Sequence, residues 1–128
     1  MMRATTALAQ GMTDDATALT PKKLADAFKG GNQSLGTNGY QKLPGGLILQ
    51  WGSGTSSGTG SLAITFPVAF PNDCVSIVGV PVAAAGQGIA CKLLTSALSA
   101  TAATLATFST GTGNQQSAIQ VFWIAVGY

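Results

Sequence analysis

From Tyr40 onward, short apolar runs alternate with segments rich in Gly, Ser, Thr, Asn and Pro. Runs of this length that are bounded by turn-forming residues are typical of an all-β domain. The Ala and Leu content of residues 89–109 is also compatible with a helix, but the threonines of that region favour strands. The pattern predicts six strands, at Gly46–Trp51, Ser61–Phe66, Cys74–Val82, Ile89–Ser96, Ala102–Ser109 and Ala118–Gly127. We therefore expect a mainly β fold, an antiparallel β-sandwich with its strands running up and down.

The last predicted strand, AIQVFWIAVGY, is apolar on both faces and carries no charge. A strand that is buried on one face alternates apolar and polar residues, whereas one that is buried on both faces reads as a continuous apolar run. One face carries Val121 and Trp123, and the other carries Phe122 and Ile124. Both faces need to be buried against other elements, and a chain of 128 residues has few residues available to cover both.

Residues 1–38 follow a different pattern, which predicts a short helical segment ahead of an all-β domain at residues 39–128. In the stretch LTPKKLADAFKGG, Thr20 is a suitable N-cap and Pro21 occupies the first helical position. Leu24 and Phe28 share one face, and Gly30 or the glycine after it ends the helix. Because so short a helix is marginal alone in water, this face must dock on something, most simply on other copies of the chain.

The first, third and fifth connections between the predicted strands are Gly-rich and polar, namely Ser53–Gly60, Ala83–Gly88 and Thr110–Ser117. If the strands alternate in direction, these three loops lie together at one end of the sandwich. The other end then holds the remaining turns, the entry from the helical segment and the C-terminus. Adaptable polar loops grouped on a rigid β scaffold are typical of a binding surface.

Amides and hydroxyls in these loops are the candidate binding groups, because they can hydrogen-bond sugar hydroxyls without a charge. An ordinary solvated hairpin is the alternative for each of them. The main candidates are Thr112, Asn114, Gln115, Gln116 and Ser117, and further candidates are Ser53, Thr55, Ser56, Ser57, Thr59 and Gln87. The tryptophans, Trp51 and Trp123, fall within predicted strands, so we expect both to pack in the core rather than stack on a sugar.

Composition excludes several classes of function. Only 8% of the residues are charged, against roughly a quarter in a typical soluble domain. After Lys42 the charged residues are Asp73 and Lys92 alone, and His and Glu are absent. Paired catalytic carboxylates, a His-dependent nucleophile and a zinc site are therefore not expected, and no cofactor is implied.

A net charge of +2 without a basic cluster argues against a nucleic-acid partner. No apolar run approaches the length of a membrane helix, and the N-terminus lacks the apolar core of a signal peptide. For the cysteines, Cys74 and Cys91, buried free thiols are favoured over a disulfide. The composition thus favours a protein that is not an enzyme.

Three motifs, in a fixed order, resemble the C-terminal domain of bacteriophage and prophage tail fibres. They are GYQKLPGGLILQWG at residues 39–52, ITFPVAFPNDC at residues 64–74 and FWIAVGY at the end of the chain. The segment ATTALAQGMTDDATALTPKKLADA at residues 4–27 resembles the stretch that precedes many tail-fibre tips. The Gly-rich loops match no family pattern, which suits a surface that varies with the host.

The resemblance implies a homotrimeric receptor-binding tip at the distal end of a tail fibre in the virion, made in the host cytoplasm. Its receptor would be lipopolysaccharide or an outer-membrane protein, and R-type bacteriocin fibres use similar parts. Two-faced apolar strands and few charges agree with an intersubunit surface. We expect a C-terminal fragment of a fibre with an added start Met. Alternative functions are a purely structural trimerisation module and a depolymerase remnant.

Overall fold

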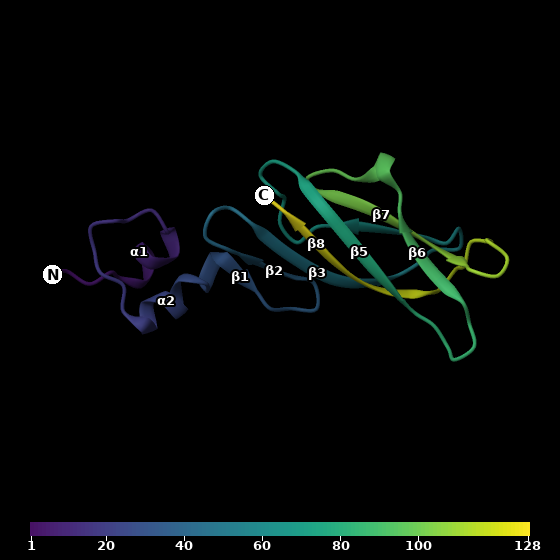
Figure 1. Ribbon diagram of the computed structural model, residues 1–128, viewed down its shortest axis with the longest axis horizontal. Helices are drawn as coiled ribbons and strands as arrows, with labels where there is room; N and C mark the ends of the chain where they lie inside the picture. The colour runs from purple at the N-terminus through teal and green to yellow at the C-terminus, as the bar shows by residue number, and fades with distance from the viewer.

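The computed structural model describes residues 1–128 as a small helical module followed by a β-sandwich (Figure 1). The helical module contains α1 (Thr6–Gly11), α2 (Pro21–Ala27) and the 3-10 turn η1 (Gly30–Asn32). It extends from one end of the sandwich, and the N-terminus lies at its outer limit. No helix of the chain has the length and apolarity that crossing a membrane requires.

Both helices begin at a threonine cap. The Thr20 side chain accepts the backbone N–H of Lys23 at 3.3 Å and Pro21 opens the first turn, which confirms the predicted start of α2. Thr5 caps α1 in the same way through the N–H of Leu8, but the sequence pattern did not predict this helix. Six residues are too few to show a helical period, so α1 is held by its cap and by packing on α2.

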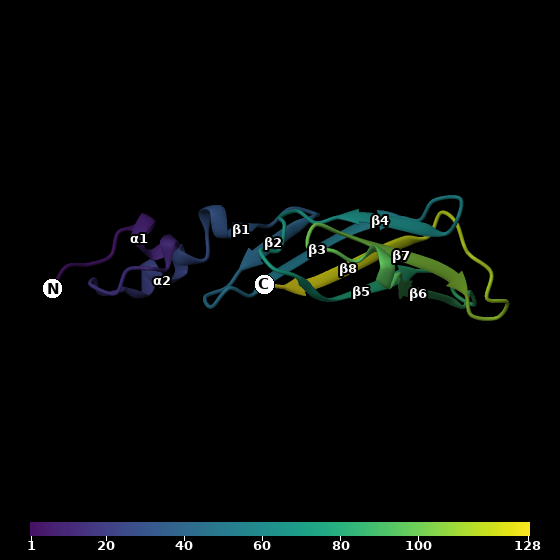
Figure 2. The same ribbon diagram turned by 90° about the horizontal axis from the view of Figure 1, so that it is seen from above.

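The sandwich consists of two antiparallel sheets. One has the strand order β1-β2-β3-β8-β5 and the other has the order β4-β7-β6. The strands are β1 (Gln33–Ser34), β2 (Gly39–Lys42), β3 (Ile48–Thr55), β4 (Ser61–Thr65), β5 (Cys74–Val82), β6 (Ile89–Leu93), β7 (Ala102–Ser109) and β8 (Gln120–Gly127). The chain runs alternately toward and away from the helical module (Figure 2). The predicted antiparallel sandwich is therefore confirmed.

The predicted number of strands and some of their bounds need correction. β3 extends through Thr55, because Ser53–Thr55 pairs with Gln120–Phe122 of β8, although its Gly and Ser content reads as a loop. β6 ends at Leu93, where a 3-10 turn η2 (Thr95–Ala97) follows. The short strands β1 and β2 lie in segments that were not predicted as strands. They are added to the sheet by pairing with each other and with β3 rather than by an apolar pattern.

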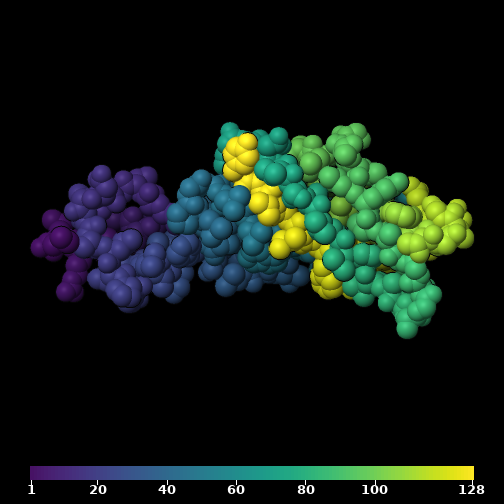
Figure 3. Space-filling model, in the orientation of Figure 1, coloured from purple at the N-terminus to yellow at the C-terminus, as the bar shows by residue number.

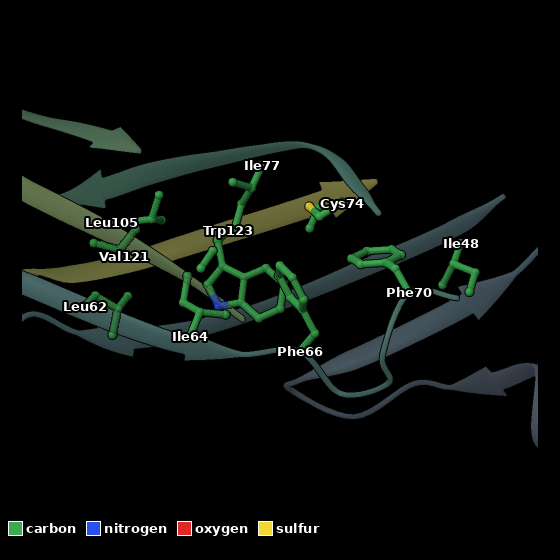
Figure 4. Close-up of a cluster of buried hydrophobic side chains, with 12 residues drawn as sticks. Ile48, Leu62, Ile64, Phe66, Phe70, Cys74, Ile77, Leu105, Val121 and Trp123 are labelled. Atoms are coloured by element: carbon green, nitrogen blue, oxygen red, sulfur yellow. The ribbon is translucent and has the colours of Figure 1, made fainter. Parts of the chain in front are cut away.

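The core lies between the two sheets and is closed at one end by the segment that joins β4 to β5 (Figure 4). In that segment Phe66 packs edge-on against Phe70, with ring centroids 5.1 Å apart, and lies 5.9 Å from the ring of Trp123. The clustered side chains are Ile48, Leu62, Ile64, Phe66, Phe70, Cys74, Ile77, Ala103, Leu105, Val121, Trp123 and Ala125. Cys74 is buried and Cys91 is half-buried, and both are free thiols.

Candidate binding loops and intersubunit face

Three loops meet at the end of the sandwich that is farthest from the helical module (Figures 1 and 2). They are the loops after β3, after β5 and after β7, as the alternating strand directions predicted. The first and third are joined because Ser56 N donates to Ile119 O at 2.8 Å and Ala118 N donates to Ser56 O at 3.0 Å. The second is tied to the third by Thr110 N, which donates to Gly88 O at 2.8 Å. The loops thus form one continuous surface.

Two buried hydroxyls position this surface. The Ser56 hydroxyl donates to Gln116 O at 3.1 Å and accepts the N–H of Ile119 at 3.0 Å. The Thr107 hydroxyl lies 2.6 Å from the same Gln116 carbonyl oxygen and 3.2 Å from Gly60 O. Ser56 is 4% exposed and Thr107 is fully buried, so neither side chain is available to a ligand.

Thr107 was missed by the sequence reasoning, although a signal existed. It continues the inward-facing series of Ala103 and Leu105 along β7, and a polar residue in such a series requires a partner inside the fold.

The candidate residues fall into three groups in the structure. Ser56 is buried, and Ser53 and Thr55 lie within β3 rather than in a loop, which corrects their predicted location. Gln116 is half-buried, because its backbone carbonyl is held by the two hydroxyls. The exposed candidates in the loops are Ser57, Thr59, Gln87, Thr112, Asn114, Gln115 and Ser117.

The loop after β7 holds its side chains on a tight turn. Ser109 N donates to Asn114 O, and Gly113 N donates to Ser109 O, both at 2.8 Å. Gly113 adopts φ +73°, a left-handed conformation that side chains other than those of Gly, Asn and Asp rarely accept. Asn114 N then donates to the Thr112 hydroxyl at 3.3 Å. The turn leaves the amides of Asn114 and Gln115 exposed at the limit of the molecule.

No charged residue occurs in these loops. The nearest basic side chain along the chain is Lys92 on β6, whose ammonium lies 5.5 Å from the centroid of the Phe108 ring. Phe108 in turn bridges to Gln115. A ligand that meets the loops therefore encounters amides, hydroxyls and backbone groups, with one cation and one aromatic ring on the flank.

The outer face of the five-stranded sheet is apolar and uncovered. The register places Ile124 between Trp51 and Val78, and Phe122 between Ser53 and Val80. Val75, at the register shift of β5, is 62% exposed. The other large apolar side chains exposed on β5 and β8 are Val78, Val80, Val82, Phe122 and Ile124, with exposed fractions between 45% and 59%. Atoms of β8 form a stripe at the surface between β3 and β5 (Figure 3). A single copy thus leaves one face of its central strand open to water.

The two tryptophans lie on opposite faces. Trp123 packs over Gly52 in the core, as predicted. Trp51 lies over Gly39 on the outer face and donates its indole N–H to Gly36 O at 3.1 Å. The predicted core position of Trp51 is therefore wrong, because adjacent strands place residue 51 in register with outward-facing Ile124.

Comparison with known proteins agrees with the motifs. Residues 42–128 match the family described as putative tail fiber protein gp53-like, C-terminal. An uncharacterised protein of Methanocaldococcus jannaschii is 30% identical over 95 residues, which cover 71% of this chain and 63% of that protein.

Solved structures of pyocin fibres share the fold. The C-terminal part of the P. aeruginosa R2 pyocin fibre aligns with a TM-score of 0.62 at 24% identity, over 88% of this chain and 30% of the fibre chain. An N-truncated R1-type pyocin tail fibre aligns with a TM-score of 0.59 at 23% identity, over 87% of this chain and 98% of that chain. The chain thus spans less than two thirds of the curated relative and about a third of the R2 fibre chain. It belongs to the gp53-like tail fibre family, whose C-terminal domain it carries, and it shares its fold with the R-type pyocin fibres.

Proposed function

We propose that this domain is the receptor-binding tip of the fibre and that it acts without catalysis. The observation that carries the proposal is the joined surface of three uncharged loops at the end of the sandwich opposite the helical module. Binding residues are commonly found on loops that a rigid scaffold positions, as the buried Ser56 and Thr107 hydroxyls do here. The receptor is a component of the bacterial surface, either lipopolysaccharide or an outer-membrane protein.

The tip works as a homotrimer. The uncovered face of β5 and β8 supports this assembly, because an apolar sheet face without charges resembles an obligate subunit interface. Weak binding at each of three copies then gives stable adsorption through multivalency. Residues 1–38 couple the trimeric tip to the fibre shaft, and the loops face away from the particle at its distal end.

Replacement of Asn114, Gln115 and Gln116 together by alanine tests the proposal. We expect adsorption to host cells to be abolished, while the solution mass and the melting temperature stay close to those of the unchanged protein. Asn72→Ala is the matched control, because Asn72 is an exposed amide at the opposite end of the sandwich. Unchanged adsorption by the triple variant would contradict the placement of the receptor site.

A purely structural trimerisation module is the second candidate function, and the uncovered apolar face is the observation in its favour. The two candidates differ in their binding to host cells. A tip competes with whole fibres for host cells, and it loses binding to isogenic cells that lack its receptor through truncated lipopolysaccharide or deleted porins. A structural module neither competes nor binds. Release of soluble saccharide from host polysaccharide would instead support the enzymatic alternative.

A further inference from the structure

The indole of Trp123 has an N–H group without a partner in the protein. Its side chain is 94% removed from solvent, since Trp123 is only 6% exposed. Buried indole N–H groups usually find an acceptor, as that of Trp51 does at Gly36 O. Every fully enclosed side-chain nitrogen or oxygen of the chain has a hydrogen-bond partner. The Trp123 N–H therefore keeps some access to the surface rather than being sealed in the core.

That access is a small crevice at the seam between the two sheets. Its volume is about 130 Å³, and it is lined by Asn38, Ser53, Leu62, Ala63, Ile64, Thr65 and Trp123. It forms because β2 begins at Gly39, paired with Trp51, so that the part of β3 after Trp51 has no neighbour on that side and lies opposite β4 as a free edge. In Figure 4 the indole nitrogen of Trp123 lies on the side of the ring toward Leu62 and Ile64.

Gly52 brings the polar groups of the crevice together. A Cβ at this position would overlap Asn38 Oδ1 and would lie only 2.7 Å from Trp123 Cε2, the ring atom bonded to the indole nitrogen. The absence of a side chain thus allows Asn38 to approach the polar edge of the indole. Asn38 Oδ1 accepts the N–H of Ser53 at 3.0 Å, which leaves the Asn38 amide N–H₂ group without a protein partner.

We propose that this seam crevice, the surface lined by Asn38, Ser53, Thr65 and Trp123, binds one neutral sugar unit of the receptor glycan. The crevice contains the hydrogen-bond donors of Asn38 and Trp123, the hydroxyls of Ser53 and Thr65 and apolar side chains, but no charged side chain. An uncharged ligand with several hydroxyls fits this chemistry, whereas a phosphate or a carboxylate has no cation to meet there. The volume corresponds to roughly four water molecules, which suits part of a sugar ring. The proposal rests on the receptor-binding function and assigns it a second contact beside the loops.

The two tryptophans provide a direct test in the full chain. In a proton–nitrogen NMR spectrum they give two indole N–H signals, and the Trp51 signal is an internal control because its N–H is bonded to Gly36 O. Titration with glucose, galactose and N-acetylglucosamine should shift the Trp123 signal, with saturation for at least one sugar, while the Trp51 signal stays in place. If no sugar moves the Trp123 signal, or if both signals move together, the proposal is overturned.

Asn38→Asp separates the sugar contact from the fold. The substitution keeps an oxygen to accept the Ser53 N–H but replaces the amide donor by a second acceptor. We expect the sugar concentration at half-maximal shift of the Trp123 signal to rise at least about tenfold, which corresponds to the loss of one hydrogen bond to the ligand. Asn72→Asp makes the same chemical change at an exposed site away from the seam and should leave the response unchanged. An equal response in both variants would contradict the role of Asn38.

Failure of the seam site and failure of the proposed receptor-binding function give different results. In one outcome the unchanged protein binds host cells, the Asn114–Gln116 alanine variant does not, and no sugar shifts the Trp123 signal. The tip function then stands and the seam site is rejected. If the Trp123 signal responds but the alanine variant adsorbs normally, the loop site is rejected and the seam site is supported.

Discussion

Single buried polar side chains organise both ends of the sandwich. Gln50 on β3 is fully buried, and its amide donates to Val68 O at 2.7 Å and accepts Val68 N–H at 3.0 Å. These two bonds hold the segment that carries Phe66 and Phe70 over the core. Ser56 and Thr107 perform the corresponding role at the loop end. At the scale of the residue, hydrogen bonding inside the core therefore sets the shape of the surface.

Gln50→Leu should destabilise the fold by about 1–3 kcal/mol, because it leaves the Val68 N–H and C=O without their partner. Chemical denaturation at a fixed protein concentration measures the change as a lower midpoint with an unchanged slope. Gln115→Leu, at an exposed loop residue whose side chain makes no hydrogen bond within the chain, is the control and should have little effect. A midpoint for Gln50→Leu equal to that of the control would show that the clamp contributes nothing.

The Asp26 carboxylate on α2 forms ion pairs with three lysines. The ammonium groups of Lys22, Lys23 and Lys29 lie 3.2–3.8 Å from it. The hydrogen bond from Lys22, followed by the three positive charges, lowers the pKa of Asp26 below its ordinary value of 3.8. A lowered pKa in the folded state means that the carboxylate stabilises the helical module above pH 3.8. That stabilisation is lost as the pH falls below 3.8 through the lower folded value.

We therefore expect helical circular dichroism to decrease on acidification from about pH 5 to about pH 2, and to decrease less in Asp26→Asn. Asp14, whose pKa is lowered by its hydrogen bond to Thr17, contributes in the same direction. A residual transition in Asp26→Asn should consequently disappear when Asp14→Asn is added. Identical acid transitions in all variants would exclude both carboxylates as its source.

At the scale of the element, β8 explains why an apolar run closes the chain. It is the central strand between β3 and β5, with Val121, Trp123 and Ala125 turned into the core. Phe122 and Ile124 alternate with them and face outward together with Val80. The inward face is covered within one copy, and the outward face is the surface that we assign to the trimer.

Val80→Asp tests this assignment. A carboxylate at the centre of the face would be buried without a partner in the trimer, at a cost of about 3–5 kcal/mol at each copy. We expect sedimentation or light scattering to show monomers, with the β circular dichroism retained because Val80 lies outside the core. Ala63→Asp, on the outward face of β4, is the control and should leave the mass unchanged. A trimer that tolerates Val80→Asp would place the subunit interface elsewhere.

At the scale of the whole molecule, the helical module and the sandwich touch through a narrow junction. Gln41 Nε2 donates to Phe28 O at 3.0 Å and to Asn32 O at 3.2 Å, and the Tyr40 hydroxyl donates to Gly31 O at 3.2 Å. The core cluster contains no residue of the helical module. The division of the chain near residue 38 stays a prediction, with β1 paired to the sandwich just before it.

Residues 33–128 should consequently fold without the helical module. The junction includes three partly exposed side-chain hydrogen bonds, each worth about 0.5–1.5 kcal/mol, so we expect the fragment to melt at a lower temperature but still in a cooperative transition. Tryptophan fluorescence follows the unfolding, because both tryptophans lie in the sandwich. Failure of this fragment to fold would show that the two parts form a single cooperative unit.

The sequence by itself determined the features that depend on near neighbours. The start of α2 follows from Thr20 and Pro21, and β5 and β7 coincide with their apolar runs because turn residues bound them on both sides. The ordered motifs likewise identified the tail fibre family before the fold was known.

Only the tertiary structure decided the features that depend on pairing between distant strands. The register with β8 made Ser53–Thr55 a strand and turned Trp51 outward, although no local pattern marks either. Contact between loops about sixty residues apart buried Ser56 and withdrew it from the exposed candidates. The crevice beside Trp123 exists because β2 begins only at Gly39 and because Gly52 has no side chain. A period of two residues indicates that a strand has two faces, but the neighbouring strand decides which face meets water.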